Sequence, residues 1–236
     1  VAGPVLAPVM ASAHRLWRLV AWASFRRRES QPPLAPPHIE PAGTIRAAFV
    51  VRDNLRFRHA IEDAYLEALA GAREEIVIAN AYFFPGRRFR QALLDAAARG
   101  VRVTLLLQGV SDHPLQVYAT RALYPIFLAA GIRLFEYHRS HLHAKVAVID
   151  RQWATVGSSN IDAFSLLLAR EANVFVDDED FALHLRVSLE AAICSGAREL
   201  KSSDWQRLPL LRRGLSWLAY QLVRLAIGVA GFGGAH

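Results

Sequence analysis

Apolar and polar residues alternate along residues 45–195 in a way that predicts strands and helices in turn. Short, largely apolar runs predict strands at 47–52, 75–84, 101–107, 132–137, 144–149, 153–156 and 172–176. Apolar residues at three- and four-residue spacing predict helices at 58–72, 88–98, 115–130 and 179–193. Because strands that alternate with helices of this length form α/β domains, we expect an α-β-α sandwich with a mixed, largely parallel sheet and helices on both faces.

Composition separates three further segments from this α/β domain. Residues 1–28 are apolar and then basic, which is the opposite of the order in a secretory signal. Residues 29–44 contain five prolines and are expected to form a linker. Residues 196–236 form a basic, Trp- and Leu-rich tail. Gln221 and Arg224 interrupt its apolar run, so we expect either an amphipathic helix at a membrane surface or a helix packed on the domain.

The formal net charge of +7 favours an anionic partner, which is a lipid head group, a membrane surface or nucleic acid. Charge alone does not choose among these partners. The single cysteine, Cys194, excludes a disulfide framework within one chain. Histidines outside residues 141–143 show no ligand spacing, so we expect neither a metal nor another cofactor.

One segment carries residues suited to phosphodiester chemistry, because His143 to Asn160 has the pattern H-x-K-x4-D-x6-G-S-x-N. His143 and Lys145 are two residues apart on a predicted strand, so their side chains are expected on the same face. A phosphodiester needs a nucleophile and a cation together, since negative charge must be held while phosphorus is attacked. The neutral imidazole of His143 is therefore the candidate nucleophile, and Lys145 is the candidate phosphate clamp.

The other residues of the pattern are expected to support these two. Ser158 and Asn160 follow the next strand and can donate hydrogen bonds to the same phosphate oxygens, and Gly157 lets the backbone turn tightly. Asp150 lies seven residues after His143, at the end of the strand and on its opposite face. We therefore expect Asp150 to support the site from a loop or a salt bridge, without a direct part in the chemistry.

The use of lysine strengthens the assignment of Lys145. Of the 28 Lys and Arg residues, only Lys145 and Lys201 are lysine, and one of the two lies two residues after a histidine. A compact ammonium can turn three donors toward phosphate, where a planar guanidinium fits less well. His141 has no lysine two residues later and is expected to be structural or to lie at the rim of the substrate site.

These residues resemble the phospholipase D superfamily, and the similarity extends over roughly residues 45–195. Within the superfamily the sequence looks like the C-terminal half of the bacterial cardiolipin synthases of type B. The segments that carry this resemblance are Val51–Asp53, Ile78–Gly86, Leu134–Tyr137, Trp153–Asn160 and Glu171–Val174. The resemblance implies the phospholipase D-like α-β-α sandwich, of which this chain would form one half.

The resemblance also implies a mechanism. Two such half-sites face each other in the family, and one histidine attacks phosphorus while the other protonates the leaving oxygen. The acidic residue of the family's downstream strand falls on Glu171, where it would hydrogen-bond Nδ1 of a histidine and fix its tautomer. The implied reaction transfers a phosphatidyl group between two phosphatidylglycerols through a phosphatidyl-histidine intermediate, with release of glycerol.

Partners and location follow from the same resemblance. The implied substrates are phospholipids, with an anionic membrane surface as partner. The chain would lie at the bacterial inner membrane, peripheral or tail-anchored, on the cytoplasmic side. A second half-site is required, because Glu199 stands two residues before Lys201 and no second H-x-K exists. It would come from a missing N-terminal half or from a second chain. The sequence begins with Val1 and not with Met, and this start, together with the basic and proline-rich segments, favours a fragment.

Two other functions compete with this one. A homodimeric phosphodiesterase or nuclease of the same superfamily would use the positive charge for DNA. The basic residues are, however, spread through helices and termini without an evident stacking platform, so we expect no nucleic-acid partner. A non-catalytic half that kept the fold would have no need of an intact His143, Lys145 and Asn160.

Overall fold

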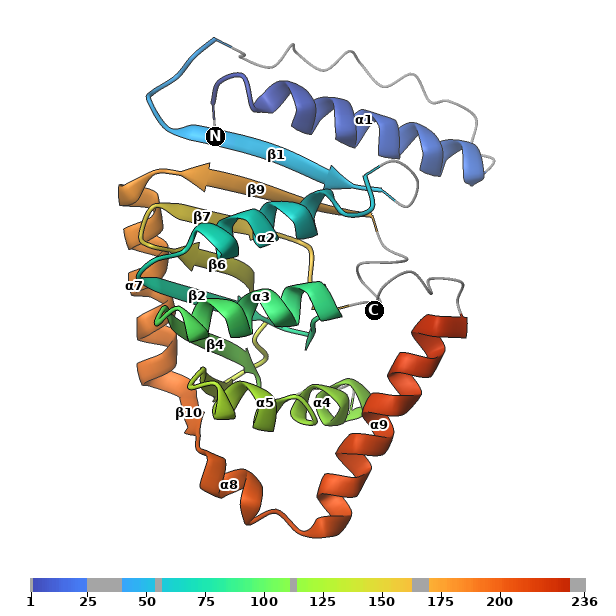
Figure 1. Ribbon diagram of the computed structural model, residues 1–236. Helices are drawn as coiled ribbons and strands as arrows, with labels where there is room; N and C mark the ends of the chain where they lie inside the picture. The colour runs from blue at the N-terminus through green and yellow to red at the C-terminus, as the bar shows by residue number, and fades with distance from the viewer. Residues whose placement is uncertain (1, 25–39, 54–56, 111–113, 163–169, 230–236) are drawn as a thin grey trace.

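The computed structural model describes residues 2–24, 40–53, 57–110, 114–162 and 170–229 (Figure 1). Its centre is an eight-stranded sheet in the order β1-β9-β7-β6-β2-β4-β5-β10. These strands are β1 (Arg46–Arg52), β2 (Glu75–Asn80), β4 (Arg102–Gln108), β5 (Arg133–Tyr137), β6 (Lys145–Ile149), β7 (Trp153–Gly157), β9 (Glu171–Asp177) and β10 (Ala197–Leu200). Two short strands, β3 (Phe83–Phe84) and β8 (Ile161–Asp162), pair with each other beside this sheet.

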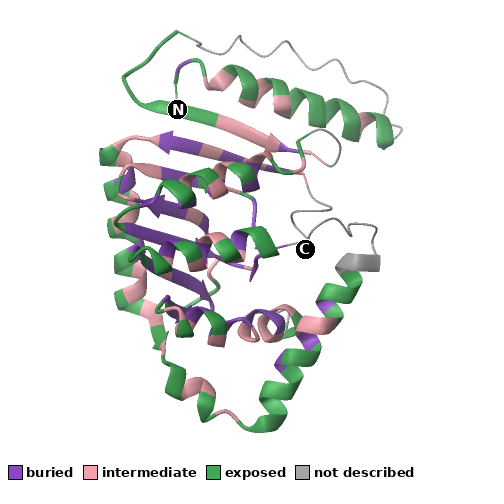
Figure 2. Cartoon of the chain, in the orientation of Figure 1, coloured by how far each residue is buried: buried purple, intermediate pink, exposed green. Residues whose placement is uncertain are grey.

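Helices cover both faces of the sheet, as the alternating pattern predicted (Figure 1). The helices are α1 (Leu6–Ala23), α2 (Ala60–Gly71), α3 (Arg87–Ala98), α4 (Pro114–Arg121), α5 (Tyr124–Ala129), α7 (Glu179–Gly196), α8 (Ser202–Gln206) and α9 (Leu210–Val229). The main core lies between the sheet and α2, α3, α4 and α5, while α7 packs on the opposite face through Ala182 and Leu189. Figure 2 shows the buried central strands between these exposed helices.

The mixed α/β sheet is confirmed, but the expectation that it would be largely parallel is wrong. Among the described strands of the large sheet, only β2 with β4 and β4 with β5 pair in parallel. Both parallel pairs join strands that are connected through helices, α3 between β2 and β4, and α4 and α5 between β4 and β5. From β5 to β8 the strands follow one another without an intervening helix, and the β6–β7 connection turns through Asp150 and Arg151, both with positive φ (51° and 54°), which suits a tight antiparallel hairpin.

Two predicted elements are interrupted. The expected strand at 75–84 ends at Asn80, because Phe83 and Phe84 leave the large sheet to pair with β8. The expected helix at 115–130 is divided into α4 and α5, and Pro125, which cannot donate a helical N–H, lies in the first turn of α5. Most of the predicted linker at 29–44 falls outside the described residues.

The predicted tail forms α8 and α9. Within the described part of the chain, neither α9 nor any other helix combines the length and apolarity needed to cross a bilayer. Instead, α9 packs on α4 and buries Ser216, Ala219 and Val223. The N-terminal segment forms α1, which runs along β1 at the edge of the sheet (Figure 1).

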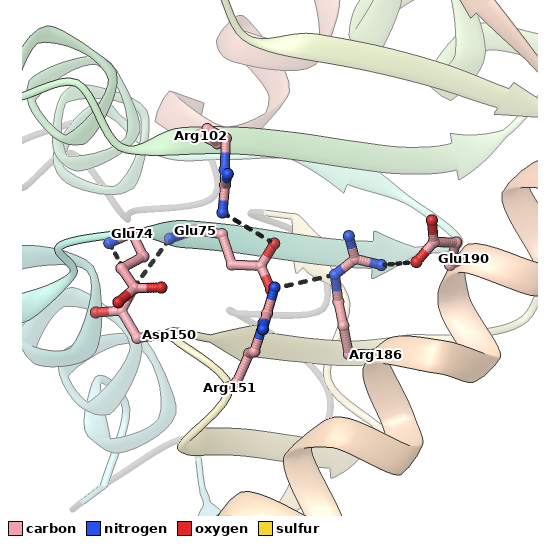
Figure 3. A network of polar contacts seen from close by, with 7 residues as sticks. All are labelled: Glu74, Glu75, Arg102, Asp150, Arg151, Arg186 and Glu190. Carbon is pink, nitrogen blue, oxygen red and sulfur yellow. Dashed lines mark hydrogen bonds and ion pairs between the residues drawn. The ribbon is translucent and has the colours of Figure 1, made fainter.

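Asp150 fixes the start of β2 at the opposite end of β6 from Lys145. Its carboxylate accepts hydrogen bonds from the backbone N–H groups of Arg73 (2.8 Å), Glu74 (2.8 Å) and Glu75 (2.9 Å). Glu75, which is buried, is surrounded by the guanidinium groups of three arginines (Figure 3). These are Arg102, Arg151 and Arg186, at 3.9, 3.4 and 3.3 Å from its carboxylate oxygens. Asp150 therefore belongs to a polar network that joins β2, the β6–β7 turn and α7.

We expect Asp150→Ala to lower the free energy of unfolding by on the order of 3 kcal/mol, because three backbone donors lose a charged acceptor and alanine is strained at positive φ. Asp150→Asn keeps an acceptor and tolerates this conformation, so its loss should be smaller. Urea unfolding followed by circular dichroism measures both. If Asp150→Ala kept full stability but lost phosphodiester chemistry, Asp150 would instead take a direct part in the reaction.

Candidate active site

The predicted site residues gather where β1 ends and where β6 and β9 begin. Lys145 is the first residue of β6 and Glu171 the first of β9. Strand register places Lys145 opposite Asn80, the last residue of β2, and Glu171 opposite Arg52, the last residue of β1. Because these strands lie in one sheet, residues distant in sequence share one of its edges, which we call the site edge.

His143 lies in the segment before β6, so the expectation that it would share a strand with Lys145 is wrong. Its side chain is exposed, and its backbone carbonyl accepts a hydrogen bond from Lys145 Nζ at 3.2 Å. A residue that precedes the strand takes no part in the hydrogen-bond ladder of the sheet, and its side chain can project from the site edge. The imidazole is thus open to a substrate while its backbone is held by the neighbouring lysine.

Lys145 is buried, with 7% of its surface exposed. Burial lowers the pKa of its ammonium, while the nearby carboxylates of Glu171 and Asp162 act in the opposite direction. The ammonium is therefore a cation with little water around it and with two carboxylates nearby. Such a group interacts more strongly with an incoming phosphate than an exposed lysine does.

Glu171 accepts a hydrogen bond from Ser158 Oγ, which itself accepts one from the backbone N–H of Ala172 at 3.1 Å. Burial raises the pKa of the Glu171 carboxyl, and the Ser158 hydrogen bond and the charges of Arg52 and Lys145 oppose that effect. Among the described residues, no hydrogen bond joins Glu171 to His143. The carboxylate is instead a fixed acceptor beside the lysine.

Asn160 is part of a pair of amide contacts that join the segment after β7 to the end of β2. Asn160 Oδ1 accepts from the backbone N–H of Tyr82 at 3.4 Å, and Asn80 Oδ1 accepts from that of Ile161 at 3.2 Å. Both asparagines are buried. These contacts hold the Asn160 amide, the expected phosphate donor, beside the strand that faces Lys145.

Gly157 is required by a close contact and not by an unusual turn, since it is not among the glycines with positive φ. A Cβ at this position would lie 2.0 Å from Oδ1 and 2.2 Å from Cγ of Asn173. The Asn173 side chain is buried and donates from Nδ2 to Thr155 Oγ1 at 3.1 Å. A side chain at 157 would therefore have to displace the amide that ties β9 to β7.

Two charged residues at the site edge were not predicted from the sequence. Arg52 is fully buried and donates from Nε to the carbonyl of Arg58 at 3.0 Å. Burial lowers its pKa, while Glu171 and Asp162 raise it. Asp162, in β8, is also buried. The available signal was a charged residue at the end of an apolar strand, which is rarely buried without a partner of opposite charge.

Together the site edge combines an exposed imidazole, a buried ammonium, a hydroxyl, an amide and two carboxylates. This set can attack a phosphodiester, hold its non-bridging oxygens and keep the charges in balance. In the described part of the chain, no group of three or more His, Cys, Asp or Glu is arranged to hold a metal ion. His141 is exposed two residues before His143, and its Nδ1 lies 3.4 Å from Gln108 Nε2.

We expect Glu171→Gln to lower the rate of attack on the phosphodiester, while thermal stability at pH 7 stays unchanged or rises. A raised carboxyl pKa means that the folded state binds the proton more tightly than the unfolded state, so the ionised form costs stability at neutral pH. That cost fades as the pH falls through the raised pKa, and the difference between variant and parent should fade with it. Thermal unfolding at pH 7 and pH 5 tests this.

Glu199→Gln is the matched control, because Arg133 lowers the pKa of that carboxyl. Its ionised form adds stability above the ordinary pKa, and this contribution is lost as the pH falls. The same substitution should therefore lower stability at pH 7, by a small amount because the pair is partly exposed. A large loss of stability in Glu171→Gln at pH 7 would point to a structural role for Glu171.

Comparison with known proteins gives a consistent result. The family profile described as "Cardiolipin synthase, PLD-like domain" matches residues 65–193. Cardiolipin synthase B of Escherichia coli K12 is 38% identical over 229 residues, which are 97% of this chain and 52% of that protein. Cardiolipin synthase B of Salmonella typhi is 41% identical over 82% of this chain and 47% of that protein. The chain thus spans about half the length of the curated relatives it matches.

Solved structures share the fold. Phosphatidylserine synthase of Haemophilus influenzae has a TM-score of 0.59 at 12% identity, over 82% of this chain and 49% of that one. The phospholipase D family member Nuc of Salmonella typhimurium has a TM-score of 0.54 at 18% identity, over 67% of this chain and all of that one. At these identities the likeness concerns the fold alone.

Proposed function

Since the chain belongs to the family of PLD-like domains of cardiolipin synthases, as its resemblance predicted, we propose that it supplies one half-site of a phosphatidyltransferase that makes cardiolipin. The observation that carries this proposal is the arrangement of His143 and Lys145: the histidine is exposed, and its backbone carbonyl accepts a hydrogen bond from Nζ of the buried lysine. The names of the relatives supply the substrate class.

The proposed reaction has two transfers. The His143 imidazole attacks phosphorus of one phosphatidylglycerol, a nitrogen–phosphorus bond forms, and the bond to the glycerol head-group oxygen breaks. A proton from a second histidine goes to that oxygen, and glycerol leaves. The same second histidine then takes the proton from a hydroxyl of another phosphatidylglycerol, whose oxygen attacks phosphorus and frees His143. Lys145, with donors from Ser158 and Asn160, would hold the non-bridging oxygens in both transfers.

The second histidine would belong to another half-site that faces this one. Glu171 supports this arrangement, because its carboxylate is held by Ser158 and not by His143. A carboxylate fixed at the site edge is available to a histidine that approaches from outside the chain. We therefore propose that Glu171 orients the second histidine, whether that residue lies in an N-terminal half or in a second copy.

The proposed place of action is the inner membrane of a bacterium, at its cytoplasmic face, with an anionic bilayer as the source of both substrates. The net charge of +7 supports attraction to such a surface. Phosphatidylglycerol carries the phosphodiester that is attacked and also the hydroxyl that accepts the phosphatidyl group. A single lipid can thus serve as both donor and acceptor.

The test is to incubate the chain, together with its second half-site, with phosphatidylglycerol labelled in the phosphate and in the head-group glycerol. We expect labelled cardiolipin and one released glycerol for each cardiolipin formed. A parallel incubation with supercoiled plasmid should leave it intact. Nicked plasmid without cardiolipin would overturn the proposal in favour of a nuclease, and phosphatidic acid as sole lipid product would indicate hydrolysis.

A further inference from the structure

Helix α9 carries a row of exposed leucines, which we call the leucine stripe. Its members are Leu211, Leu215, Leu218, Leu222 and Leu225, exposed by 76, 44, 48, 48 and 64%. Their separations of four, three, four and three residues place them along one side of a helix. Large apolar side chains that line up on one exposed face indicate a surface that is covered in the working state.

The leucine stripe lies on a different face of α9 from the one by which the helix is anchored. Ser216, Ala219 and Val223 are buried against the body of the protein, where α9 packs on α4. Tyr220, on the same face, contacts the ring of Phe84, with ring centroids 5.5 Å apart. Because α9 already packs by this face, the stripe is not needed for the fold that the structure shows.

The charges of α9 favour an anionic occupant for the stripe. The helix contains Arg212, Arg213 and Arg224 and no acidic residue. The same leucine spacing also suits a coiled coil, but two copies of this helix would bring arginines together without a carboxylate to pair them. Trp217 is also 60% exposed on this helix. Leucine, tryptophan and arginine together are typical of a helix that lies in the interface of an anionic bilayer.

The anchored face of α9 connects the stripe to the site edge. Phe84, which Tyr220 contacts, pairs in β3 with Asp162 in β8. A small pocket beside these strands is lined by Val223 of α9 together with Tyr82 and Asp162. Tyr82 in turn donates its backbone N–H to Asn160. A surface that binds α9 would therefore also restrain β3 and β8, and β8 begins directly after Asn160.

Helix α1 also exposes large apolar side chains, on several sides of the helix. Its second half exposes Leu16, Trp17, Leu19, Val20 and Trp22. The helix also reaches the site, because Arg170, the residue before Glu171, donates to Ser12 Oγ at 3.5 Å. Helix α1 is therefore a second exposed apolar element near the site edge.

We propose that the leucine stripe of α9 is a docking surface for an anionic lipid bilayer. The ring contact between Tyr220 and Phe84 would then hold the docked helix against the strands next to the site edge. The docking itself stands on the exposed leucines and the arginines. Its use in presenting lipid head groups to His143 rests on the proposed function.

Vesicle binding tests the docking without any need for catalysis. The 236-residue chain is mixed with vesicles of equal parts phosphatidylglycerol and phosphatidylcholine, and with vesicles of phosphatidylcholine alone, and the bound fraction is measured by flotation. We expect binding to the anionic vesicles, weakened about 10-fold or more by Leu218→Glu combined with Leu222→Glu. His143→Ala should bind as the parent does, which separates failure of docking from failure of the chemistry.

The matched control is Leu183→Glu combined with Val187→Glu on α7, where the two side chains are 46 and 57% exposed on another helix. These changes add the same two carboxylates and remove apolar side chains of similar size, and they should leave binding within about 2-fold of the parent. Equal loss in both pairs would overturn the proposal, because it would reflect charge alone. Unchanged vesicle binding by the α9 pair, with a fall in molar mass by light scattering, would overturn it in favour of a seam between protein chains.

Discussion

His143→Ala is expected to abolish phosphatidyl transfer, with a loss on the order of 10⁴-fold or more, the scale at which an enzyme loses rate with its nucleophile. The structure makes this a clean experiment. The imidazole is exposed, and the hydrogen bond from Lys145 Nζ goes to the backbone carbonyl of His143, which alanine retains. The substitution should therefore leave the free energy of unfolding unchanged within about 0.5 kcal/mol.

The measurement is cardiolipin formation in the same preparation in which the parent chain, with its second half-site, shows transfer. Denaturing electrophoresis after acid-free quenching should also show labelled lipid bound to the parent and none bound to the variant. His141→Ala is the matched control, because that histidine is also exposed, lies two residues earlier, and has its Nδ1 3.4 Å from Gln108 Nε2. Unchanged transfer in His143→Ala would mean that this half is non-catalytic.

Much of the fold followed from sequence, because buried strands and amphipathic helices have distinct periods. The six buried residues of β2 and the alternating burial of β9 are examples. Strand direction did not follow, since an apolar run has the same composition in either direction. The edge strand β10 was missed for a related reason: its residues, Ala-Arg-Glu-Leu, are partly or fully exposed, and only pairing with β5 makes them a strand.

The site was predictable where the sequence places its residues close together. His143, Lys145, Ser158 and Asn160 lie within one segment, and spacing alone identified them. Glu171 came from family resemblance. Arg52 was not foreseen, because its place opposite Glu171 depends on the register of β1 with β9, two strands that are paired in the sheet but far apart in the sequence. Long-range register therefore sets the charge balance around Lys145.

Lys145→Arg is expected to lower phosphatidyl transfer by about 100-fold although the charge is kept, as when one preorganised donor to a developing oxyanion is lost. Lys145 is buried beside Glu171 and Asp162, with its ammonium bonded to the carbonyl of His143. A guanidinium is larger and planar, so it cannot occupy this space without moving its neighbours. The N–H groups of the guanidinium would also pair with the carboxylates and would no longer point to the place where the phosphate binds.

The chain supplies the control in its only other lysine. Lys201 is exposed at the start of α8, so Lys201→Arg makes the same chemical change away from the site edge and should leave transfer within about 2-fold of the parent. Both variants are compared by cardiolipin formation and by thermal unfolding. Near-normal transfer in Lys145→Arg would contradict the prediction and show that the site needs only a positive charge there. Low transfer with an unchanged melting temperature would mean that the compact ammonium itself positions the phosphate.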